Sequence, residues 1–338
     1  MITAGILTAG GDCPGLNAVI RSVTARLAAS GAGTVGFRNG WAGVMEGEAV
    51  PLDRDAVRGI LGRGGTILGT SRRDPYVHGD GLASLSSALE EHQVDVMIVI
   101  GGDGTLRTAA RLADEGMAVI GVPKTIDNDI PGTDITFGFH TAVQIATDAI
   151  DRLTTTAEAH HRVMLVEVMG RSQGWIALYS GLAGGADVIL IPEMPLPLAE
   201  AAAIITARHA SGHNYSVVVV AEGVEGPDPR ELPRDAFGFE RLGGVAYRIA
   251  PVLEELTGFE TRVTVLGHLQ RGGTPSAFDR VLATRLGAAA ADAALAGEHG
   301  VMVAVRGPDV TTVPLSAVEG PTRGVDPALF AVARTFFG

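Results

Sequence analysis

Two short polar segments of this chain carry residues that could do chemistry. They are Gly101–Thr105 (GGDGT) and Pro123–Asp129 (PKTIDND). Each follows an apolar run typical of a buried strand, at residues 94–100 and 118–122. Parallel sheets bind ligands just beyond the carboxyl ends of their strands, so we expect both segments at one edge of a sheet. Three carboxylates, a lysine and a glycine turn there could hold a polyphosphate through a metal and activate a neighbouring hydroxyl.

Asp103 is the candidate metal ligand. A carboxylate in a glycine turn after a buried strand can reach a Mg²⁺ ion that bridges phosphate oxygens. The same carboxylate could instead cap the following helix. The five residues alone are not specific, because NAD kinases and lipid kinases share them.

Asp127 and Asp129 are the candidate acid–base pair. In an extended segment, residues i and i+2 point to the same side, so we expect the two carboxylates to lie close together. Such a pair favours general-base catalysis by one member, which supplies about 10²–10⁴-fold in rate. The alternative is a pair of turn aspartates ahead of Pro131.

Glycine turns and arginines supply candidate phosphate contacts. Residues 10–15 (GGDCPG) join a strand to a helix, where backbone N–H groups can face an anion. This segment has neither the Walker A nor the dinucleotide-binding pattern. Guanidinium groups match phosphate oxygens well, although an arginine at a strand end is often only a surface charge. The arginines near glycine turns or strand ends are Arg72, Arg73, Arg162, Arg171, Arg262 and Arg271.

Composition limits the class of protein. With 338 residues, 46% apolar and 19% charged, the chain is expected to be globular and long enough for two domains. A formal net charge of -12 argues against nucleic-acid and anionic-membrane partners. A single cysteine, Cys13, no positive charge before Arg21, and no apolar run of about 20 residues together predict a cytoplasmic location.

Apolar runs alternate with helical patterns along most of the chain. Strands are predicted at Ile2–Leu7, Val163–Val168 and Ser216–Val220, and a helix at Pro14–Ala29. This alternation predicts an α/β fold of parallel sheets covered by helices on both faces. The stretch Gly223–Gly244 is predicted to be a long surface excursion.

The constellation resembles the 6-phosphofructokinase family over nearly the whole chain. The most specific blocks are residues 101–105, 124–129, 166–171 and 267–273. The resemblance implies two doubly wound αβα sandwich domains with the active site in the cleft between them. Residues 1–138 plus about 270–320 would form the larger, ATP-binding domain. Residues 139–269 plus about 321–338 would form the smaller domain, which binds fructose 6-phosphate.

The resemblance also implies roles for individual residues. Asp127 would be the base for the sugar 1-hydroxyl, with Thr125 and Asp129 beside it, and Arg72 and Arg171 would balance charge on the phosphoryl group. Asp103 would hold Mg²⁺. The ATP site would be lined by Gly11, Arg72, Arg73, Gly102, Asp103, Gly104 and Thr105. Fructose 6-phosphate would be held by Thr125, Ile126, Asp127, Arg162, Met169, Gly170, Arg171, Glu222, Arg262, His268, Leu269, Gln270 and Arg271.

In that family Arg162 and Arg262 come from a neighbouring subunit, so the resemblance implies a homo-oligomer, usually a tetramer. The phosphoryl donor depends on Gly104 and Lys124. Family members that use pyrophosphate have Asp and Lys at these places, and the best-known bacterial ATP enzymes have glycine at both. The mixture in this chain resembles the mixed-substrate branch of the family.

Gly104 predicts ATP as the donor. An Asp at position 104 would stand where the α-phosphate belongs, and two like charges 4 Å apart cost about 4 kcal/mol at an effective dielectric of 20. The sequence therefore predicts an ATP-dependent 6-phosphofructokinase of glycolysis. The alternatives are a pyrophosphate-dependent enzyme and, more remotely, a non-catalytic regulatory subunit. Sedoheptulose 7-phosphate, which presents a similar ketose end, stays open as an acceptor.

Overall fold

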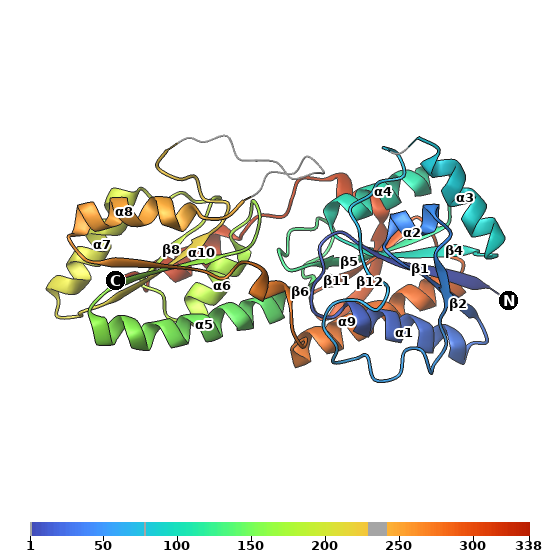
Figure 1. Ribbon diagram of the computed structural model, residues 1–338, viewed down its shortest axis with the longest axis horizontal. Helices are drawn as coiled ribbons and strands as arrows, with labels where there is room; N and C mark the ends of the chain where they lie inside the picture. Colours follow the sequence, from blue (N-terminus) through green and yellow to red (C-terminus); the bar gives the residue numbers. More distant parts are fainter. Residues whose placement is uncertain (1, 78, 229–241) are drawn as a thin grey trace. The chain divides into compact units, whose positions relative to one another are not determined.

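The apolar runs and helical patterns build two units, each around its own parallel sheet (Figure 1). The computed structural model describes residues 2–77, 79–228 and 242–338. Unit 1 comprises Met1–Thr141 and Arg271–Thr322, and unit 2 comprises Ala142–Gln270 and Arg323–Gly338. Most of the predicted excursion at Gly223–Gly244 lies at residues 229–241, outside the described residues.

The sheet of unit 1 has the order β12-β11-β5-β4-β1-β2-β3, and β6 pairs with β5. Pairing is parallel except for β12 with β11 and β3 with β2, so antiparallel strands close both edges. The strands are β1 (Thr3–Ala9), β2 (Gly33–Phe37), β3 (Ala49–Pro51), β4 (Val96–Gly101), β5 (Val119–Thr125), β6 (Phe137–Gly138), β11 (Val301–Arg306) and β12 (Asp309–Pro314).

Helices cover both faces of this sheet. Helices α1 and α9 pack together on one face, whereas α2, α3 and α4 lie on the other, where Leu7, Phe37, Trp41, Val99 and Leu106 join one buried cluster (Figure 1). The helices are α1 (Leu16–Ala29), α2 (Trp41–Met45), α3 (Gly81–Glu91), α4 (Asp103–Asp114), α9 (Ala277–Leu295) and the 3-10 helix η2 (Leu315–Glu319).

Unit 2 is a smaller sandwich whose strands are all parallel, in the order β10-β7-β9-β8. The strands are β7 (Val163–Val168), β8 (Val188–Leu190), β9 (Ser216–Ala221) and β10 (Thr261–Val265). The helices are α5 (Phe139–His160, which begins in unit 1), α6 (Trp175–Ala183), α7 (Leu198–Ala210), α8 (Val245–Thr257), η1 (Gly267–Arg271) and α10 (Pro327–Arg334).

The two faces of this second sheet bury different helices. Leu165, Val218 and Val220 pack against α7 and α8, whereas Ile189 and Val219 face α6 (Figure 1). The predicted α/β class, with parallel sheets between helical layers, is confirmed. None of the helices in the described part of the chain combines the length and apolar character needed to cross a bilayer.

Candidate functional site

Parallel register places three polar loops side by side at the carboxyl ends of the central strands of the unit 1 sheet. Ala9 at the end of β1 pairs with Gly101 at the end of β4, and Gly101 pairs with Pro123 in β5. The loops after β1 and β4 therefore leave the sheet level with each other, beside the end of β5. The two polar segments lie at neighbouring strand ends, as predicted. Strand β5 is longer than predicted, however, because it continues through Lys124 and Thr125.

Asp103 is the first residue of α4 and forms an ion pair that the sequence analysis missed. Arg107 Nε donates to Asp103 Oδ1 at 2.9 Å, and Arg107 Nη2 donates to the Gly320 carbonyl at 3.3 Å. The i,i+4 spacing of an acid and an arginine on one helix could have revealed this pair. Within the described part of the chain this ion pair engages Asp103 through Oδ1.

The loop that follows β5 is bent rather than extended. Asn128 has φ of 54°, in the left-handed region, so the prediction of an extended Asp127–Asp129 segment is wrong. Two bonds from Thr136 hold the loop: its N–H donates to Asn128 Oδ1 at 3.0 Å and its hydroxyl donates to the Thr125 carbonyl at 2.8 Å. An amide side chain that accepts a bond across a short loop explains why Asn occupies this strained position.

Asp127 is buried in this loop with one unsatisfied oxygen. Its N–H donates to Thr125 Oγ1 at 3.0 Å, whereas Asp127 Oδ1 is buried without a hydrogen-bond partner among the described residues. Burying an unpartnered carboxylate oxygen is costly, so the position suits a group that accepts a proton from a ligand.

Lys124 ties the end of β5 to the loop after β1. Its ammonium group is buried and donates to the Gly11 carbonyl. Burial lowers the pKa of Lys124, while the neighbouring Cys13 and Asp127 act in the opposite direction. Gly10, in the same loop, has φ of 81°, a left-handed conformation that favours glycine.

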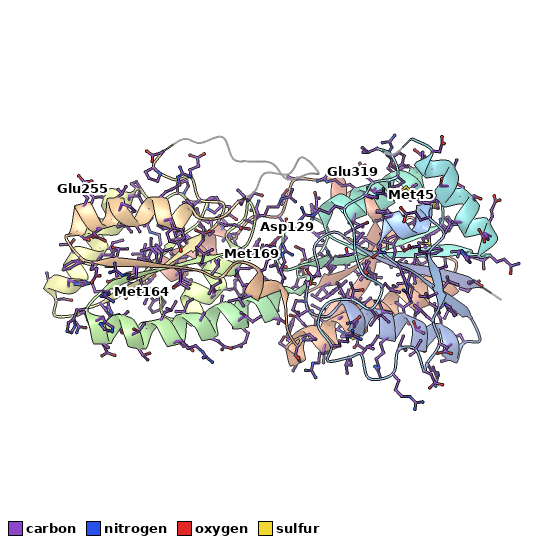
Figure 2. All side chains as sticks on the ribbon, in the orientation of Figure 1. Met45, Asp129, Met164, Met169, Glu255 and Glu319 are labelled. Carbon is purple, nitrogen blue, oxygen red and sulfur yellow. The ribbon has the colours of Figure 1, made fainter. Side chains whose placement is uncertain are left out.

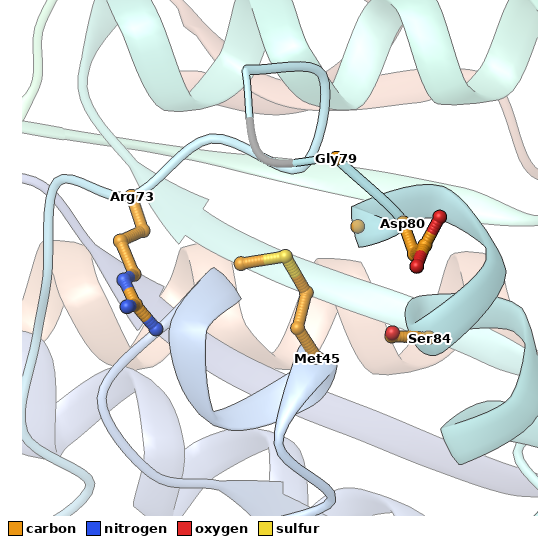
Figure 3. Close-up of a pocket in the computed structure, with 6 residues that line it drawn as sticks. Met45, Arg73, Gly79, Asp80 and Ser84 are labelled. Atoms are coloured by element: carbon orange, nitrogen blue, oxygen red, sulfur yellow. The ribbon is translucent and has the colours of Figure 1, made fainter.

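The segment that carries Arg72 and Arg73 is attached to the same loop. The Gly10 N–H donates to the Ser71 carbonyl at 2.9 Å, and the Thr70 hydroxyl donates to the Gly10 carbonyl at 2.6 Å. The Arg73 side chain pairs with Glu46 at the end of α2 and lines a shallow hollow with Met45, Asp80 and Ser84 (Figure 3). A carboxylate thus already balances the charge of Arg73, and its contact with a phosphate donor stays a prediction.

Arg271 also reaches the loop after β1. Its Nη1 donates to the Asp12 carbonyl at 3.2 Å, and a Cβ added at Gly11 would lie only 2.9 Å from that nitrogen. The structure therefore places Arg271, predicted to contact the sugar phosphate, beside Gly11, which was predicted to contact the donor.

The carboxyl ends of β7 and β9 bring together a second set of predicted residues, all in unit 2. Glu222 Oε1 accepts the N–H groups of Gly170 and Arg171, at 3.3 and 2.9 Å. The Met169 N–H donates to Oε1 of the buried Gln270 at 3.3 Å. Both Gly170 and Arg171 have positive φ, so a tight turn presents these groups.

Arg162 and Arg262 lie at the opposite, amino-terminal end of the same sheet. Arg162 Nε donates to Glu260 Oε2 at 2.7 Å, and Arg262 pairs with the other oxygen of Glu260. These bonds hold the pKa of Glu260 below its usual value, chiefly through Arg162. Glu260 was not predicted from the sequence, although it is only two residues from Arg262.

The length of β7 separates the two sets of unit 2. Met164 and Met169 lie near its opposite ends (Figure 2). Its six residues span about 20 Å at 3.3 Å per residue. The remaining predicted residues, His268 and Leu269, are exposed on η1, Leu269 by 69%.

Comparisons with known proteins found a matching family and similar chains. The sequence matches the phosphofructokinase family over residues 3–294. It is 53% identical to a pyrophosphate--fructose 6-phosphate 1-phosphotransferase of Streptomyces coelicolor, over 99% of both chains. It is 50% identical to ATP-dependent 6-phosphofructokinase 3 of the same organism, over 98% of both chains.

A solved structure shares the fold. The crystal structure of Pichia pastoris phosphofructokinase in the T-state superposes with a TM-score of 0.84 and 31% identity. The match covers 99% of this chain and 36% of the longer Pichia chain.

Proposed function

The chain belongs to the phosphofructokinase family, and we propose that it transfers the γ-phosphoryl group of ATP to the 1-hydroxyl of fructose 6-phosphate. Family membership makes it a phosphotransferase of glycolysis with an alcohol acceptor. The presence of the proposed base Asp127, the proposed metal ligand Asp103 and the candidate phosphate arginines argues against the alternative of a non-catalytic subunit. Family membership does not identify the phosphoryl donor, because close relatives are named for both pyrophosphate and ATP.

The main observation in favour of ATP as the donor is the free space around Gly104. Gly104 lies in the first turn of α4, next to Asp103, and a Cβ added to it would meet no atom within 4 Å. The backbone there could therefore accept a side chain, so packing does not explain the glycine. The space is instead available to a longer donor, whose α-phosphate would meet no carboxylate at this position.

Lys124 does not argue strongly for pyrophosphate in this chain. Its ammonium group is buried and bound to the Gly11 carbonyl. Holding the loop after β1 is a sufficient reason for a lysine at the end of β5, whichever donor binds. The two positions therefore carry unequal weight, and Gly104 is the more direct indicator.

We assign the base to Asp127. Its buried Oδ1 has no partner among the described residues, so the 1-hydroxyl of the sugar could donate to it and lose its proton during transfer. The bond from the Asp127 N–H to Thr125 orients the loop for this step. Arg72 and Arg171 are assigned to balancing the charge of the phosphoryl group in transit.

Asp103 fits a Mg²⁺ ion, because its carboxylate stands at the start of α4 and engages Arg107 through Oδ1. When bound, the ion neutralises charge on the donor phosphates. The backbone N–H groups at the first turn of α4, including those of Gly104 and Thr105, would bind the donor phosphates from the helix N-terminus.

The separation along β7 supports a homo-oligomer, which the family resemblance predicts as a tetramer. Met169–Arg171 and Glu222 lie at one end of the sheet, and Arg162 and Arg262 lie at the other, about 20 Å away. One hexose phosphate is too short to contact both sets in one chain. We infer that Arg162 and Arg262 hold the 6-phosphate bound to a neighbouring copy, with His268 contributed locally.

Steady-state assays with each donor test the proposal. With Mg²⁺ and fructose 6-phosphate held at saturation, kcat/KM for ATP is expected to exceed that for pyrophosphate, because no acidic side chain opposes the nucleotide at position 104. Pyrophosphate turnover equal to or above ATP turnover overturns the choice of donor.

Gly104→Asp tests the charge argument itself. A carboxylate about 4 Å from the α-phosphate costs about 4 kcal/mol, so kcat/KM for ATP is expected to fall by up to about 10³-fold. Gly104→Asn is the matched control, because it has the same shape without the charge and should lose less than about 10-fold. Equal losses in the two variants would show that space, not charge, selects the donor.

Asp127→Asn tests the base. Removing a positioned base is expected to lower kcat by about 10²–10⁴-fold, with little change in KM for fructose 6-phosphate. Asp129→Asn changes the second acid of the same loop and is expected to cost less. If the two variants lose the same activity, the base is not Asp127 alone.

Mixed oligomers test the shared site. Arg162→Ala lacks a phosphate contact and Asp127→Asn lacks the base, so each pure variant is expected to be nearly inactive. Co-expressed, differently tagged copies isolated as hybrids should regain activity, because some sites combine an intact Asp127 with a neighbour's intact Arg162. Hybrids as inactive as both parents would place all contacts within one chain.

A further inference from the structure

One buried acid has no role in the chemistry assigned above. Asp279, in the first turn of α9, is 0% exposed. Its Oδ2 accepts two bonds from Thr141, from the backbone N–H at 2.7 Å and from the hydroxyl at 2.5 Å. Thr141 is the third residue of α5, so a carboxylate on one helix caps the start of another.

The capping is reciprocal. The Ser276 N–H, at the start of α9, donates to the Thr141 hydroxyl at 3.0 Å. The Asp279 N–H donates to the Ser276 hydroxyl at 3.3 Å. The first turns of α5 and α9 therefore interlock through three side chains. The Asp279 carboxylate binds the N-terminus of α5 and itself belongs to the first turn of α9, where a negative charge is favourable.

The first turn of α5 is continuous with the segment that holds the Asp127 loop. Strand β6, directly before α5, pairs with the last two residues of β5, Lys124 and Thr125. Thr136, just before β6, makes the two bonds that fix the bend at Asn128. Residues 136–141 thus connect the proposed catalytic loop to Asp279.

The first turn of α9 is continuous with the segment that carries Arg271. Residues 271–276 run from Arg271, bound to the Asp12 carbonyl, to the cap at Ser276. Along this path the Gly273 carbonyl lies so close to Gly64 that a Cβ there would approach it to 2.2 Å. This segment is therefore fixed on the glycine loops of unit 1.

We propose that Asp279 is a positioning residue for phosphoryl transfer, which holds the Asp127 loop and the Arg271 segment in one fixed relation through its bonds to Thr141. The inference rests on the proposed role of Asp127 as the base. An error of about 1 Å in the placement of a reacting group can cost about 10²-fold in rate, so a rigid link between these segments has a direct use.

The electrostatics of the position agree with this role. Burial raises the pKa of Asp279, and the bonds from Thr141, with nearby His140, oppose that rise. A neutral amide in place of the carboxylate would keep the shape and lose the charge that is favourable at both helix N-termini.

Asp279→Asn and Thr141→Val, each of nearly native shape, test the link. Both are expected to lower kcat by about 10- to 100-fold while KM for each substrate stays within about 3-fold. The double variant is expected to lose no more than the worse single variant, because both remove one interaction. Thr141→Ser keeps the hydroxyl and should retain kcat within about 3-fold of the unaltered enzyme.

Asp187→Asn is the matched control for stability. Asp187 is also a buried acid, which pairs with Arg208 at 3.0 Å and accepts the Val217 N–H at 2.8 Å, in unit 2. It is expected to lower Tm, as Asp279→Asn does, with kcat within about 2-fold of the unaltered enzyme when assayed well below Tm.

Unchanged kcat in Asp279→Asn, or in Thr141→Val where the former fails to fold, overturns the inference. An equal loss of kcat in Asp187→Asn also overturns it, because the effect would then follow stability alone. Asp127→Asn, measured alongside, distinguishes failure of the proposed base from failure of the proposed positioning role of Asp279. Full activity in that variant removes the proposed base, whereas its loss beside an unaffected Asp279→Asn removes only the positioning role.

Discussion

The parallel register of β1, β4 and β5 is the constraint on which the proposed chemistry depends. Ala9, Gly101 and Pro123 stand side by side in three neighbouring strands, so the loops that follow converge at one edge. A shift of one residue in any pair would turn its buried side chains to the opposite face, where they would not fit the close packing against the covering helices. The positions of Asp103 and Lys124 are thus set by burial of side chains that have no chemical role.

In this acidic chain, the arginines proposed to bind anionic ligands already have oxygen partners. The arginines near the predicted sites are engaged by oxygen atoms: Arg107 by Asp103, Arg73 by Glu46, Arg162 and Arg262 by Glu260, and Arg271 by the Asp12 carbonyl. Exposed ion pairs contribute little to stability, so under the proposed function a phosphate would replace such a partner at little cost. These partners hold the guanidinium groups in place before a ligand binds. Such local groups of arginines are needed because the chain as a whole, with a formal net charge of -12, repels anions.

The fold and the positions of the polar loops could be predicted because they follow from patterns within short stretches of sequence. Buried parallel strands are continuous apolar runs, and the glycine-rich segments directly follow those runs. Strand β5 was predicted too short because its last residues, Lys124 and Thr125, are polar although buried. The bend at Asn128 depends on Thr136, and the cap of α5 depends on Asp279, 138 residues from Thr141. Such partners are unremarkable in local sequence, because only the folded chain brings them together.

The donor question shows why a residue's surroundings carry more weight than its identity. Relatives named for pyrophosphate and for ATP are 53% and 50% identical to this chain, a difference too small to favour either. The family resemblance associates a lysine at position 124 with pyrophosphate, but the Lys124 ammonium group here joins the end of β5 to the loop after β1. Gly104 has no such structural explanation, because a side chain would fit there and none is present. A position that packing leaves free can reflect the ligand, and for this reason we rank Gly104 above Lys124 and ATP above pyrophosphate.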